Sequence, residues 1–148
     1  MNIKRAIGII FLVCIAASIA CIIEAKLIGV DLETTDPSNI PLAMWYVAII
    51  SVVLLVAAGT AWFFNSPETV PNAKNGFLFG LLAIVIGFFG DIIALVPHKN
   101  GLGILLEYYS QPKYWAAFIL ILMTCALVGY VKSKKKRLNA KNSWQKNE

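Results

Sequence analysis

The chain has 148 residues, of which 59% are hydrophobic and 14% are charged, and its formal net charge at pH 7 is +5. A soluble domain of this size could not bury so much apolar surface, so the composition excludes a water-soluble globular protein. Most of the length lies in long apolar segments, which leaves no room for a separate soluble domain.

Four apolar segments are each long enough to cross a membrane as a helix. They cover residues 3–28, 42–64, 76–97 and 113–131. A hydrocarbon core of ~30 Å takes about 20 helical residues, and a backbone in lipid must satisfy its own hydrogen bonds. The sequence therefore predicts an all-α membrane protein, an antiparallel up-down bundle of four transmembrane helices. This domain covers residues 1–131, and a basic tail, 132–148, follows it.

The first segment begins with Lys4 and Arg5 and carries one acid, Glu24, near its far end. A cleaved signal peptide is an alternative for this segment, because the sequence Ser-Ile-Ala before Cys21 resembles a cleavage site. The apolar run continues to Ile28, beyond the length of a typical signal core. That length favours a retained transmembrane helix.

The second segment lies between two prolines. Pro41 precedes it, and proline suits the start of a helix. Pro67 follows it, and the missing N–H of proline ends a helix. The sequence therefore predicts sharp boundaries for this helix.

The third segment carries small side chains at three- and four-residue steps, or sums of them, which places them along one face of a helix. These residues are Gly76, Gly80, Ala83, Gly87 and Ala94. In a membrane, such a stripe lets a neighbouring helix approach closely. Asp91 falls four residues after Gly87, on the same stripe. We therefore expect Asp91 to face protein and not lipid.

Asp91 and Glu24 are the two acids predicted to lie inside the membrane. A carboxylate costs roughly 2.5–3.5 kcal/mol at the centre of a bilayer, so both are candidates for a functional role. The first and third segments cross in the same direction, which brings the two acids to similar depth. The alternative for Asp91 is a structural hydrogen bond between helices. The alternative for Glu24 is a side chain that reaches the headgroups beside Lys26.

The segment Leu102–Ser110 is too apolar for a free loop and too short to span the membrane. It predicts a short helix in the membrane interface, between the third and fourth spanning helices. A loop packed over the helix ends is the alternative.

Basic residues gather at the two ends of the chain, and those after the fourth segment are candidates for contact with anionic lipid. They are Lys132, Lys134, Lys135, Lys136 and Arg137. Positive residues in short flanks stay on the cytoplasmic side. The pattern therefore predicts a cell-membrane protein with both termini in the cytoplasm. The basic run directly follows a spanning segment, which argues against nucleic-acid binding.

The second half of the chain has a recognisable order of features. Lys74–Gly76 leads into a glycine-bearing helix with an acid near its end, in Gly90–Pro97. A short piece ending in Glu107–Tyr109 follows, and then a last helix that begins with aromatic residues. This order resembles that of small four-helix prokaryotic membrane proteins of unassigned function. The resemblance implies a fold and a compartment, and it implies no activity.

No set of residues in the sequence predicts a catalytic or metal centre, because Cys14, Cys21 and Cys125 lie inside predicted spans without a base or a second ligand nearby. We therefore expect a non-enzymatic membrane protein without a cofactor. It would act as an accessory or regulatory subunit, or as a small oligomer, with the lipid bilayer and a membrane protein or a second copy as partners. The alternative is a small proton-coupled transporter or channel component that uses Asp91, with Glu24 as a second group.

Overall fold

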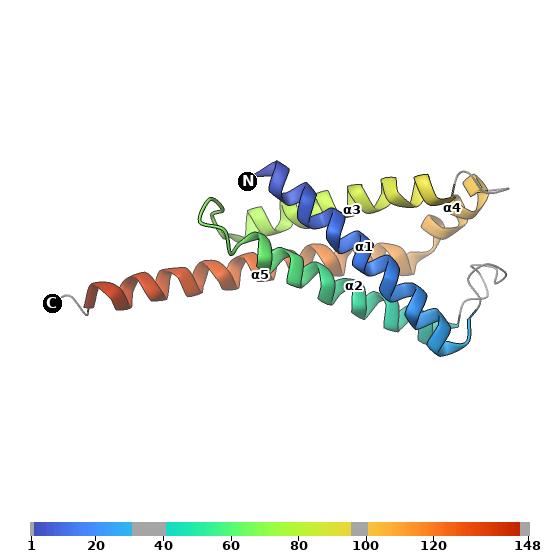
Figure 1. The fold of residues 1–148 in the computed structure, drawn as a ribbon, viewed down its shortest axis with the longest axis horizontal. Helices are drawn as coiled ribbons and strands as arrows, with labels where there is room; N and C mark the ends of the chain where they lie inside the picture. The colour runs from blue at the N-terminus through green and yellow to red at the C-terminus, as the bar shows by residue number, and fades with distance from the viewer. Residues whose placement is uncertain (1, 31–40, 96–100, 146–148) are drawn as a thin grey trace.

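The computed structural model describes residues 2–30, 41–95 and 101–145 (Figure 1). Nearly all of the described residues are helical. These helices are α1 (Ile3–Ile28), α2 (Leu42–Phe63), α3 (Ala73–Leu95), α4 (Gly101–Ser110) and α5 (Pro112–Gln145). All except α4 are long and apolar enough to cross a membrane. This confirms the predicted all-α fold of four transmembrane helices, with a short helix between the third and the fourth.

The last helix is longer than its apolar segment. α5 continues without a break from Pro112 to Gln145, so the described part of the predicted tail is helical. Residues 132–145 contain no glycine or proline, and their lysines and arginine favour helix. At ~1.5 Å per residue, 34 residues extend about 51 Å. Because a hydrocarbon core is only ~30 Å thick, one end of α5 must extend beyond it.

The spanning helices alternate in direction, and α1 begins at the end of the bundle where α5 ends (Figure 1). We call this the terminal end and the opposite end, where α4 lies, the α4 end. The closest pairs are α3 with α5 and α1 with α2, and α2 also packs along α5. α1 and α3 share a smaller contact. The order around the bundle is therefore α1, α2, α5, α3, so that α2 packs mainly on α5 and less on α3, its neighbour in sequence.

The main cluster of buried side chains lies toward the terminal end of the bundle. Its members come from all four spanning helices, and its largest fully buried side chains are aromatic: Phe63 of α2 and Phe79 of α3 have ring centroids 5.2 Å apart. The Thr60 hydroxyl of α2 donates a hydrogen bond to the Val56 carbonyl oxygen at 2.7 Å, and its oxygen lies within hydrogen-bond distance, 3.3 Å, of Cys125 Sγ on α5. This buried hydroxyl therefore ties α2 to α5 in the middle of the core.

Glycine allows α3 and α5 to touch through their backbones near the terminal end. A Cβ atom at Gly76 would lie 2.1 Å from the carbonyl oxygen of Cys125. A Cβ at Gly129 would lie 2.4 Å from the carbonyl oxygen of Asn72. No larger residue fits at either position without separating the helices. These two contacts explain why α3 packs most extensively on α5.

Candidate functional site

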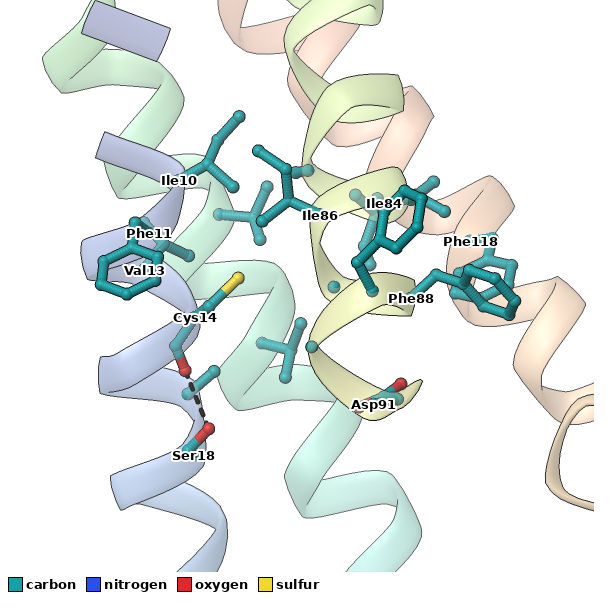
Figure 2. Close-up of a pocket in the computed structure, with 18 of the residues that line it drawn as sticks. Ile10, Phe11, Val13, Cys14, Ser18, Ile84, Ile86, Phe88, Asp91 and Phe118 are labelled. Carbon is teal, nitrogen blue, oxygen red and sulfur yellow. Dashed lines mark hydrogen bonds between the residues drawn. The ribbon is translucent and has the colours of Figure 1, made fainter. Parts of the chain in front are cut away.

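A groove of about 510 Å³ lies between α1 and α3, with α2 and α5 behind it (Figure 2). Figure 2 shows Phe11 and Cys14 on α1 and Ile86 on α3, on opposite sides of this space. Its lining is mostly aliphatic and aromatic. The groove is therefore an apolar site on the side of the bundle, within the part expected to contact lipid.

Among the described residues, Asp91 is the only acid that lines the groove. It lies on α3 toward the α4 end and is partly buried. The Tyr109 hydroxyl of α4 donates a hydrogen bond to Asp91 Oδ2 at 2.5 Å. The carboxylate expected to face protein thus has a partner on the short helix α4. The arrangement places one charged or protonatable group at the edge of an apolar space.

An aromatic cluster holds α4 in place beside Asp91. The Tyr109 ring lies 5.2 Å from the ring of Phe88 on α3 and 6.0 Å from that of Phe118 on α5. Tyr108 lies 3.6 Å from Tyr114 of α5. Burial, the hydrogen bond to Asp91 and the charge of that carboxylate raise the pKa of Tyr109 above its ordinary value. The phenol is therefore protonated at neutral pH and able to donate to the carboxylate.

Tyr109 is the site residue that sequence reasoning did not identify. The paired tyrosines at the end of the short apolar segment were the available signal. Nothing in their spacing relative to Asp91 could indicate a contact, because 18 positions separate Asp91 from Tyr109 and the two residues lie on different helices, α3 and α4.

Glu24 has a different partner. Ser51 of α2 donates a hydrogen bond to Glu24 Oε1. The other carboxylate oxygen is buried and, within the described ranges, has no hydrogen-bond partner. Glu24 is not among the residues that line the groove. The two acids expected at similar depth are therefore bound by different helices, Glu24 by α2 and Asp91 by α4.

The stripe of small residues on α3 divides into a covered and an open part. Gly76 and Gly80 pack against Cys125 of α5. Ala83 and Gly87 line the groove, and a Cβ at Gly87 would meet nothing within 4 Å. Gly90 also lines the groove and is equally open. The side chain of Ala94 lies outside the described residues.

The candidate lipid contacts lie on the part of α5 that leaves the core. Lys132 donates a hydrogen bond from Nζ to Asn65 Oδ1 at 2.7 Å. The four other basic side chains are exposed: Lys134, Lys135, Lys136 and Arg137. The structure thus assigns Lys132 a protein contact and presents the remaining charges at the surface of the helix.

Within the described parts of the chain, no group of three or more histidine, cysteine, aspartate or glutamate side chains could hold a metal ion. The groove and its carboxylate are thus the features on which a function can be argued. Comparison of the chain with protein-family models, with curated proteins and with solved structures finds no match.

Proposed function

We propose that this small multi-pass membrane protein is a non-enzymatic accessory or regulatory subunit that receives a transmembrane helix in the groove between α1 and α3. The helix belongs to a membrane-protein partner or to a second copy of this chain. The observation that carries the proposal is the pair of open glycines, Gly87 and Gly90, in the lining of this groove.

The covered glycines of α3 can be compared with the open ones. At Gly76 and Gly80 the small side chains bring the neighbouring helix α5 into close contact. At Gly87 and Gly90 the same surface is open, and no element of the described chain covers it. Helices in lipid associate by close packing at small residues, since lipid tails are as apolar as the side chains. A further helix would gain at these glycines the contacts that α5 makes at the others.

The oligomeric state of the protein extracted in mild detergent tests this proposal. Wild-type protein should run as a complex in native mass measurement, either with a partner or as an oligomer. Gly87→Leu and Gly90→Leu should release the monomer, because the new side chain fills the groove. Gly8→Leu is the matched control, since Gly8 is equally open but lies outside the lining. A wild-type monomer, or equal loss of the complex in Gly8→Leu, would contradict the proposal.

We also propose that both termini lie in the cytoplasm and that the host membrane is the cell membrane. The support is the concentration of bases on the terminal end, in Lys4, Arg5 and the basic part of α5. An impermeant thiol reagent should label Glu107→Cys in intact cells and should label Leu138→Cys only after the membrane is opened. The reverse pattern would invert the topology.

Asp91 favours a second candidate function, proton-coupled transport through the groove. The carboxylate lies against the apolar space and is held by a single described donor, Tyr109. A group that carries protons must change its protonation state within the working pH range. Infrared difference spectra between pH 5 and 8 should then contain a carboxyl band that Asp91→Asn removes and Glu107→Gln keeps. A spectrum without such a band would exclude this candidate and leave the subunit proposal standing.

A further inference from the structure

A second, polar cavity of about 310 Å³ lies at the terminal end of the bundle. One side is the start of α3, with Asn72 and Ala73. The other side is a single face of α5, since the second and third of its residues lie three and four positions after the first, and the last lies four and three positions after them. These residues are Tyr130, Ser133, Lys134 and Arg137.

The backbone contact between α3 and α5 positions this cavity. Gly129 lies against the Asn72 carbonyl oxygen, immediately before the polar face of α5 begins. That contact fixes the rotation of α5, so that the residues after Gly129 at helical spacing point along the start of α3. This backbone contact therefore holds the two sides of the cavity in place relative to each other.

The lining favours an anion. It contains two cations, Lys134 and Arg137, two hydroxyl groups and one amide, and none of the described residues that form it carries a carboxylate. The Asn72 amide oxygen already accepts a hydrogen bond from the Asn75 N–H at 2.7 Å, which leaves the amide nitrogen as the polar group able to donate. The start of a helix also carries partial positive charge. Guanidinium, ammonium and hydroxyl groups together match the oxygen atoms of a phosphate.

The position of the cavity along the membrane normal indicates that a bound phosphate would belong to a lipid headgroup. The apolar part of α5 ends at Val131, and the apolar part of α3 begins after Asn75. Tyr130 and Trp62 are exposed at the same end of the bundle, as aromatic residues are at membrane interfaces. The cavity therefore lies where hydrocarbon gives way to lipid headgroups, which is the level of lipid phosphates.

We propose that this cavity binds the phosphate group of an anionic phospholipid, with Lys134 and Arg137 as its charged contacts. The acyl chains would extend along the apolar parts of α3 and α5. The site lies at the terminal end, away from Asp91 and α4, and needs no occupant in the groove. The proposed site uses only Lys134 and Arg137 of the exposed bases. Lys135 and Lys136 point to other faces of α5 and do not line the cavity.

The test compares two double variants of equal charge in the full-length protein, purified in a mild detergent and titrated with phosphatidylglycerol. Lys134→Gln with Arg137→Gln removes both charged contacts, and Lys135→Gln with Lys136→Gln is the control. All four side chains are exposed, so neither change should disturb the fold. We expect the cavity pair to bind the lipid at least about ten-fold more weakly than the control pair. Equal affinity in the two pairs would show that only surface potential acts, and would overturn the site.

Two further titrations define the ligand. Phosphatidylcholine should bind more weakly than phosphatidylglycerol to wild-type protein, since its headgroup carries no net charge. Equal affinity for the two lipids would overturn the requirement for an anionic lipid. Inorganic phosphate should not displace bound phosphatidylglycerol at millimolar concentration. If it binds alone and the lipid does not compete with it, the ligand is a free phosphate and the lipid proposal is wrong.

Discussion

Replacing Gly76 with alanine should destabilise the bundle, whereas the same replacement at Gly87 should not. The added Cβ at Gly76 would lie 2.1 Å from the Cys125 carbonyl oxygen and 2.9 Å from its carbon. Both are backbone atoms that cannot rotate away, so α3 and α5 must separate. Overpacking of this kind costs about 1–3 kcal/mol, and alanine regains about 0.5–1 kcal/mol of helix propensity. The expected net loss in the free energy of unfolding is therefore about 1–2 kcal/mol.

Gly87→Ala provides the matched comparison, because its Cβ would meet nothing within 4 Å. Only the gain in helix propensity remains, so this variant should be as stable as wild type or more stable by about 0.5–1 kcal/mol. Thermal unfolding in one detergent measures both changes, with circular dichroism to verify equal helix content. For a chain of this size, Gly76→Ala should lower the melting temperature by about 2–8 °C. Equal melting temperatures for the two variants would refute the close approach of α3 and α5 at Gly76.

Three further predictions concern the polar groups near the α4 end. Tyr109→Phe should lower the free energy of unfolding by about 1–3 kcal/mol in detergent melts, since Asp91 loses its donor, whereas Asp91→Asn should cost less because its amide oxygen still accepts. Ser51→Ala should cost about 1–3 kcal/mol in the same assay, because it removes the donor from the partly buried carboxylate of Glu24. Burial raises the folded-state pKa of Tyr108 and Tyr109. The folded state then holds protons that the unfolded state has lost, so stability should fall as pH rises above about 10, and the midpoint of denaturant titrations should fall across that range.

The limits of the spanning helices follow from local chemistry. The range predicted for the first helix, 3–28, is that of α1, and α2 ends one residue before the predicted 64. A backbone in lipid can bond only to itself, so an apolar run between breakers such as Pro41 and Pro67 must be a helix. The extension of α5 into the basic tail was equally local, since that segment lacks helix breakers.

Contacts between helices could not be predicted from local sequence. Spacing placed Gly76 and Gly87 on one stripe of α3, but their sequence contexts do not tell which of them meets another helix. That depends on Gly129, more than 40 positions away, whose missing side chain lets α5 approach the start of α3. Tyr109 and Ser51 likewise became partners of the two partly buried acids only through folding.

The sequence by itself determined the class of protein, its four spanning helices, the short helix between the third and the fourth, and the acids that needed partners, because hydropathy and hydrogen bonding in lipid act along the chain. Only the tertiary structure decided the order α1, α2, α5, α3 around the bundle, the groove that Asp91 borders and the polar cavity beside Asn72. These features arise where the backbones of α3 and α5 touch at the terminal end, while α1 and α3 share only a limited contact. Small residues permit such contacts at many positions along a helix, and the packing of all four helices together selects among them.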